Sequence, residues 1–168
     1  TTVGIFQQIN VALDLVADRR VIAIDDADFP TDRYAVEGIA RLRNCEIRHG
    51  LDDLAGVDVV VRSLVDYRTA EVTDLEGETE RAAAHGATTV WDLSHAAGVL
   101  ELDLLAANVE LAVGCTYKFL NGGPGAPAFV FVSTDVQQRV VQPIWGWFAQ
   151  TDQFAMERPY APAPGITR

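Results

Sequence analysis

Short apolar runs alternate along this chain with segments of helical periodicity, and this alternation limits the possible folds more than any other feature. The clearest run covers residues 57–61 (VDVVV), where four of five residues are valines and the polar alternation of a half-exposed strand is missing. Such a run is typical of a strand that is covered on both faces. We therefore predict a central strand here, in a sheet with helices on both sides.

The remaining elements follow from periodicity and from turn residues. Helices are predicted over residues 4–17, from residue 29 to about 42, and over 75–85 and 101–107. Further strands are predicted over residues 21–24, 45–48, 88–91, 109–113 and 127–132. Strands and helices that take turns indicate an α/β fold with a mostly parallel sheet sandwiched by helices. Ligands of such sheets bind beyond the carboxyl ends of the strands.

Composition excludes several classes of function. The chain has 168 residues, 49% of them hydrophobic, and a formal net charge of -11, so it can form a core but carries no basic stripe for nucleic acid. Its apolar runs are far shorter than the roughly 20 residues of a membrane span. Neither a secretory signal nor paired cysteine spacing is present, since Cys45 and Cys115 are isolated. We expect a cytoplasmic protein without contacts to membrane or nucleic acid.

The stretch from residue 142 onward differs from the rest of the chain. Aromatic residues such as Trp145 and Trp147 alternate there with prolines, which indicates an ordered loop region. No capping helix is predicted before the chain stops at residues 165–168, so we expect residues 1–168 to be part of a larger domain. His49 and His85 have no neighbouring ligands in sequence, and no metal site is expected.

Asp92 and Lys118 are the strongest candidates for chemistry. They lie 26 positions apart and each follows a predicted strand, so a parallel sheet would bring both to its ligand-binding edge. Lys118 is the only lysine of the chain and stands between the apolar Tyr117 and Phe119. Pyridoxal phosphate requires a lysine amine that bonds its aldehyde and a carboxylate that keeps its ring nitrogen protonated. Asp92 and Lys118 could supply these two groups.

Two sequence blocks around Asp92 and Lys118 resemble those of a known enzyme family. Residues 91–98 (WDLSHAAG) and 115–125 (CTYKFLNGGPG) resemble the corresponding blocks of kynureninase, a branch of the aspartate-aminotransferase-like fold. The resemblance implies that Asp92 faces the pyridinium nitrogen and that His95 lies in the cofactor site. It also implies that Lys118 forms the Schiff base with pyridoxal 5'-phosphate.

Further blocks extend the resemblance along most of the chain. Residues 29–32 (FPTD), 146–148 (GWF) and the pair Thr1–Thr2 match family blocks in the expected order. They imply that Phe29 stacks on the cofactor ring and that Asp32 assists Asp92. The remaining contacts implied for the cofactor, largely through its phosphate, come from Thr1, Thr2, Ser63, Tyr117 and Trp147. Residues 66–70 follow the family pattern only loosely, because Ala70 replaces a glycine.

The resemblance implies a reaction as well as a fold. Kynureninases cleave L-kynurenine or its 3-hydroxy form with water to give anthranilate or 3-hydroxyanthranilate and L-alanine, in tryptophan catabolism and NAD biosynthesis. Lys118 and Asp92 would be catalytic, with Tyr117 as a candidate proton donor. The family also implies a homodimer and an amino-acid substrate. By the same resemblance, residues 1–168 would form part of the cofactor-binding large domain, and a small C-terminal domain would lie outside them.

Two alternatives stay open, and the sequence argues against a third. A cysteine desulfurase or another class V aminotransferase-like enzyme shares the Asp and Lys arrangement. A catalytically inactive interaction module could keep the fold. A dinucleotide-binding protein would also alternate strands and helices, but no GxGxxG follows a strand in this sequence.

Overall fold

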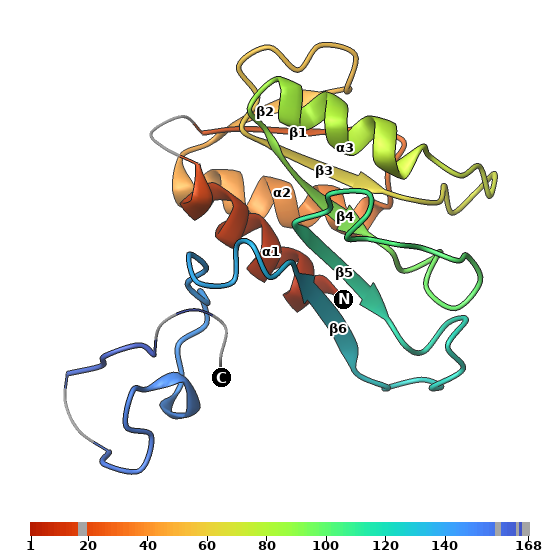
Figure 1. Ribbon diagram of the computed structural model, residues 1–168. Coiled ribbons are helices and arrows are strands. Elements are labelled where there is room, and N and C mark those ends of the chain that lie inside the picture. The colour runs from red at the N-terminus through yellow and green to blue at the C-terminus, as the bar shows by residue number, and fades with distance from the viewer. Residues whose placement is uncertain (17–19, 157–158, 164, 166–168) are drawn as a thin grey trace.

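A computed structural model describes residues 1–16, 20–156, 159–163 and 165 (Figure 1). Its centre is a six-stranded sheet in the order β2-β1-β3-β4-β5-β6. The strands are β1 (Val21–Ile24), β2 (Glu46–His49), β3 (Val59–Ser63), β4 (Thr88–Asp92), β5 (Leu111–Cys115) and β6 (Ala128–Val132). All neighbouring strands are parallel except β5 and β6, which pair antiparallel. The prediction of a mostly parallel sheet is confirmed.

Helices cover both faces of this sheet. Alternate residues of β1 show the two sides, because Ile22 and Ile24 pack with α1 (Thr2–Leu15) and α2 (Pro30–Arg43), whereas Ala23 packs in a cluster that contains Ala82 of α3 (Leu75–Ala84). The valines of β3 are likewise divided between the two clusters and are buried. The predicted central strand is therefore an interior strand, shifted by two residues.

One predicted helix, over residues 101–107, is wrong. The segment forms turns instead, in which the Asp103 carboxylate accepts the backbone N–H of Ala106 at 2.9 Å. Asn108 then adopts a left-handed conformation at φ 53° and the chain enters β5. The Asp103 hydrogen bond has the geometry of a helix N-cap, but the left-handed Asn108 ends the segment after one turn, so the apolar periodicity did not suffice to give a helix. The predicted first helix ends at Leu15, and residue 17 of that prediction lies outside the described residues.

Gly4 brings α1 close to the sheet. A Cβ atom at this position would lie 2.6 Å from Val113 Cγ2 on β5, closer than carbon atoms approach. Because α1 begins at Thr2, this contact fixes the amino end of the helix next to the end of β5. That position matters for the site described below.

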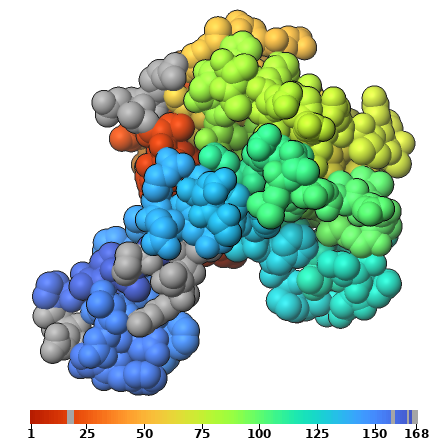
Figure 2. All heavy atoms as spheres, viewed as in Figure 1, coloured from red at the N-terminus to blue at the C-terminus, as the bar shows by residue number. Residues whose placement is uncertain are grey.

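The segment from residue 142 to 156, here called the aromatic arm, leaves the body of the protein (Figures 1 and 2). Its only described regular element is a single 3-10 turn, Trp147–Ala149, and one isolated bridge joins Gln150 to Pro162. This agrees with the predicted loop region. Among the described residues, no helix is both long enough and apolar enough to cross a membrane.

Candidate active site

A cavity of about 230 Å³ opens at the carboxyl edge of the sheet. Four chain segments contribute to it: the amino ends of α1 and α2, the end of β4 and the turn after β5. Its lining residues are Thr1, Thr2, Phe29, Thr31, Asp32, Asp92, Ser94, Tyr117 and Lys118. The sheet thus collects at one edge residues that are far apart in sequence, as expected for a parallel sheet.

Two buried carboxyl groups line this cavity. Asp92 ends β4 and is 4% exposed, and its Oδ1 accepts hydrogen bonds from the Ser94 backbone N–H at 2.8 Å and from the Ser94 hydroxyl at 2.5 Å. Asp32 is 2% exposed, in the first turn of α2. Burial, followed by the charge of Asp92, raises the pKa of Asp32 to about 8. The pair therefore retains a proton near neutral pH.

Lys118 lies at the mouth of the same cavity. Its Nζ is 2.8 Å from Nε2 of His95, and it stands 5.5 Å from the ring centroid of Phe29 and 5.6 Å from that of Tyr117. Burial, together with the charge of Lys118, lowers the pKa of His95, while the charge of Asp92 opposes this shift. A neutral His95 can accept a hydrogen bond from the lysine ammonium, which keeps the amine in one place.

Gly98 allows the approach of His95 to Lys118. It adopts φ 95°, and a Cβ atom there would lie 2.9 Å from the backbone carbonyl group of Phe119. A side chain at residue 98 would push the turn after β4 away from the turn after β5. This glycine lies in the block WDLSHAAG, but its packing role could not be read from one sequence.

The amino end of α1 supplies donors to the cavity. Thr1 is the N-cap residue and makes no side-chain cap hydrogen bond, so the first backbone N–H groups of the helix have no capping partner. Thr1 and Thr2 both line the cavity. A helix amino terminus with adjacent hydroxyl groups favours a bound phosphate.

The structure brings together nearly all the residues that the sequence singled out. Ser63 lies just behind the cavity and donates its hydroxyl to Oδ2 of Asp32 at 3.4 Å. Trp147 is the exception: it is 54% exposed in the aromatic arm, against Phe148 and Phe154, and is not a lining residue of the described cavity. Its contact with the cofactor stays a prediction.

Sequence reasoning missed Ser94 and Asp28. Ser94 follows Asp92 by two positions, a spacing at which serine can bond a preceding aspartate, so this partner was available as a signal. Asp28 accepts the Ser63 backbone N–H at 3.1 Å from a loop that precedes α2. That contact joins residues 35 positions apart and has no local signature. No group of three or more His, Cys, Asp or Glu among the described residues could hold a metal ion.

Comparison with solved structures identifies the fold. The structure resembles a cysteine desulfurase of Thermococcus onnurineus, with a TM-score of 0.81 and 14% identity, over 98% of this chain and 44% of that one. It also resembles a C-DES mutant that has glycine covalently linked to its pyridoxal-phosphate cofactor, with a TM-score of 0.80, 18% identity, and coverage of 98% and 47%. The fold is that of the pyridoxal-phosphate-dependent, class V aminotransferase-like enzymes.

In sequence, the chain is similar to kynureninases along its whole length. It is 45% identical to the kynureninase of Deinococcus radiodurans over 178 aligned residues, which cover 100% of this chain and 42% of the relative. The kynureninase of Pseudomonas fluorescens is 40% identical, with coverage of 100% and 44%. The chain spans about two-fifths of the length of these curated relatives. No family model matches the sequence.

Proposed function

We propose that the protein that contains this chain is a kynureninase, which uses pyridoxal 5'-phosphate and water to cleave L-kynurenine or 3-hydroxykynurenine. The products would be L-alanine and anthranilate or 3-hydroxyanthranilate. One observation carries the proposal: the only lysine of the chain lines the same cavity as two buried carboxyl groups. The 45% identity to a kynureninase supports this substrate over those of other enzymes with the fold.

The residues around the cavity fit the proposed cofactor. Lys118 offers an amine held beside His95. The Phe29 ring lines the cavity, where it can stack on a flat ligand, and an edge contact to Tyr67, with 5.2 Å between ring centroids, fixes its orientation. Asp92 and Asp32 can receive a protonated ring nitrogen, and the amino end of α1 can receive a phosphate. When bound, pyridoxal phosphate supplies an electron sink for charge that develops on the substrate.

The chain's own residues can handle the protons of this reaction. The Lys118 amine, in its neutral form, can remove and return the proton of the substrate carbon that carries the amino group. His95 holds that amine at 2.8 Å and, with a lowered pKa, does not add a second positive charge. Tyr117 is 46% exposed beside Lys118, which suits a donor that gives its proton to a departing group and exchanges it with water.

Enzymatic assays of the full-length protein test the proposal. We expect production of fluorescent anthranilate from L-kynurenine and an absorbance change on titration with pyridoxal phosphate. Release of sulfide from cysteine without anthranilate would favour a cysteine desulfurase. Failure to bind the cofactor would favour an inactive interaction module.

We further propose that the protein is a cytoplasmic homodimer. The described part of the aromatic arm exposes more than half of the surface of each of five large apolar side chains: Trp145, Trp147, Phe148, Phe154 and Met156. Aromatic residues gathered on a projecting segment are typical of a subunit interface. A second copy of the chain could cover them and bring Trp147 to its cofactor site. Sedimentation velocity would test the dimer. For the cytoplasmic location, the support is that Cys45 and Cys115 are free, which suits a reducing compartment.

A further inference from the structure

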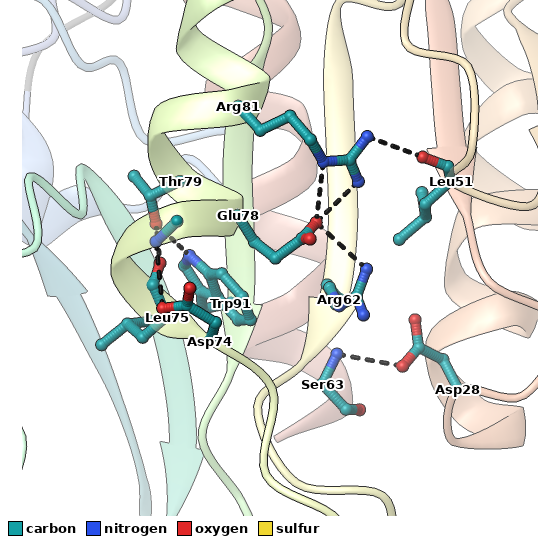
Figure 3. Close-up of polar contacts among 11 residues, drawn as sticks. Asp28, Leu51, Arg62, Ser63, Asp74, Leu75, Glu78, Thr79, Arg81 and Trp91 are labelled. Carbon is teal, nitrogen blue, oxygen red and sulfur yellow. Dashed lines mark hydrogen bonds and ion pairs between the residues drawn. The ribbon is translucent and has the colours of Figure 1, made fainter.

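Asp28 lies behind the candidate active site, in the loop between β1 and α2. Its Oδ1 accepts the backbone N–H of Ser63 at 3.1 Å (Figure 3). Its Oδ2 is buried and has no hydrogen-bond partner among the described residues. A buried carboxylate oxygen without a donor is costly, so this position requires an explanation.

Ser63 connects Asp28 to the cavity of the site. Ser63 donates its backbone N–H to Asp28 and its side-chain hydroxyl to Oδ2 of Asp32, the latter at 3.4 Å. Asp32 is in turn coupled by charge and by a hydrogen bond to Asp92. Three carboxyl groups thus form a row that runs from Asp28 to the pair that lines the cavity, with Ser63 as the link between the first two.

The charges around Asp28 leave it negative near neutral pH. Burial raises the pKa of Asp28 to about 6, and the Ser63 N–H and the Arg62 charge limit the rise. The positive charge of Arg62 on β3 is shared between Asp28 and Glu78, because its guanidinium lies 3.3 Å from the Glu78 carboxylate. Arg81 also binds that carboxylate (Figure 3). A cavity of about 370 Å³ adjoins this region, and its other acidic lining residues are Asp25, Asp66, Glu71, Asp74 and Glu78.

We propose that Asp28 is a positioning residue for the buried pair Asp32–Asp92: it fixes Ser63 and so the orientation of the Asp32 carboxyl group, while its negative charge outweighs the opposite effect of the Ser63 hydrogen bond and keeps one proton on the pair. The pair then presents one negative charge, which matches a single protonated ring nitrogen. Two unprotonated carboxylates in this buried place would repel each other. This inference rests on the proposed function, because the pair faces a ring nitrogen only if the protein binds pyridoxal phosphate there.

The stability of the cofactor-free, full-length protein tests the coupling without any catalysis. Above about pH 6 Asp28 is ionised, while folded Asp32 keeps a proton that the unfolded chain has lost, so the unfolding free energy falls with pH until folded Asp32 ionises near pH 8. Asp28→Asn keeps an oxygen that can accept the Ser63 N–H but removes the charge. We expect it to lower the pH at which this falling limb of the stability curve ends by about half to one pH unit.

Two further variants make the test sharper. Ser63→Ala removes a hydrogen bond that favours ionised Asp32. The falling limb should therefore end at a higher pH, which is opposite to the effect of Asp28→Asn. Asp74→Asn is the matched control, since it removes one charge from the same larger cavity while asparagine still caps α3. It should leave the limb in place.

The outcomes separate this inference from the proposed function. An unmoved limb in Asp28→Asn, an equal shift in Asp74→Asn, or a shift that persists in an Asp32→Asn background would overturn the role of Asp28. A wild-type protein that fails to bind pyridoxal phosphate would overturn the proposed function, whereas the shifted limb would still establish that Asp28 acts on Asp32.

Discussion

The carboxyl edge of the sheet and the aromatic arm both contain family blocks, but the chain fixes their side chains to very different degrees. At the sheet edge, Asp92 and Asp32 are buried and bonded to neighbouring residues, and Lys118 is held by His95. In the arm, Trp147 contacts only other exposed aromatic residues among its described ring contacts. A family motif therefore has fixed side-chain positions at the sheet edge but not in the aromatic arm.

The largest expected effect tests the sheet edge directly. Replacing Lys118 by Ala in the full-length protein should reduce anthranilate production by about a thousandfold or more, because no other amine of this chain can take its place. Steady-state fluorescence of the product measures this loss. Lys118→Arg retains the positive charge without the reactive amine and should lose as much activity. An active Lys118→Arg variant would show that only the charge matters.

Two tryptophans sharpen the comparison between the core and the arm. Trp91 on β4 is fully buried and donates its indole N–H to the Thr79 hydroxyl at 3.0 Å (Figure 3). Trp91→Ala should cost about 3–5 kcal/mol of unfolding free energy, as expected for a large core truncation. Trp147→Ala should change the stability of a single subunit by less than about 0.5 kcal/mol.

Replacement of Trp147 by Ala should weaken subunit association and activity rather than folding. Sedimentation velocity of Trp147→Ala should show weaker dimer formation, and anthranilate production should fall with it. Denaturant unfolding of both tryptophan variants measures the contrast. Equal destabilisation by the two changes would mean that the arm packs on its own subunit.

Asp32 gives the sheet edge a pH dependence. Its pKa is about 8 in the folded protein and 3.8 as its ordinary value, so between these values the folded state binds a proton that the unfolded state has lost. Stability without cofactor should therefore fall as pH rises through this window, by at most about 1.4 kcal/mol per pH unit. Asp32→Asn should flatten the curve, which denaturant unfolding at several pH values would measure. An unchanged slope would contradict a buried, protonated Asp32.

The smallest expected effect concerns the loop beside the site. Ala70 replaces a glycine of the family pattern and adopts φ 60°, a left-handed conformation that is unfavourable for alanine. Ala70→Gly should stabilise the protein by about 0.5–1 kcal/mol, since the strain relieved exceeds the added chain entropy of glycine. Thermal unfolding measures the gain. Loss of stability would indicate that the loop conformation differs from the one described here.

The fold was largely predictable because its signal is local. Runs of valine and the helical periodicity of residues 4–17 follow from burial, and the mostly parallel sheet followed from the predicted alternation of strands and helices, whereas the order of the strands and the antiparallel β6 were not predicted. The segment 101–107 was mispredicted because the left-handed Asn108 ends it after one turn, although Asp103 bonds the Ala106 N–H as a helix cap does. A left-handed residue of this kind leaves little trace in composition.

The candidate site was predictable in its residues but not in its supporting contacts. Asp92 and Lys118 could be paired because both follow strands of a parallel sheet. The roles of Asp28 and Gly98 depend on approaches between segments that are distant in sequence, so only the folded chain reveals them. The raised pKa of Asp32 likewise follows from burial, which the sequence of its helix start does not indicate.

The position of the cofactor bond tests the central claim most directly. The full-length protein, incubated with pyridoxal phosphate and reduced with borohydride, would be digested and its peptides weighed. We expect the added cofactor mass on the peptide that contains Lys118, and no added mass there in Lys118→Arg. Cofactor mass on a lysine outside residues 1–168, or on none, would contradict the assignment of Lys118.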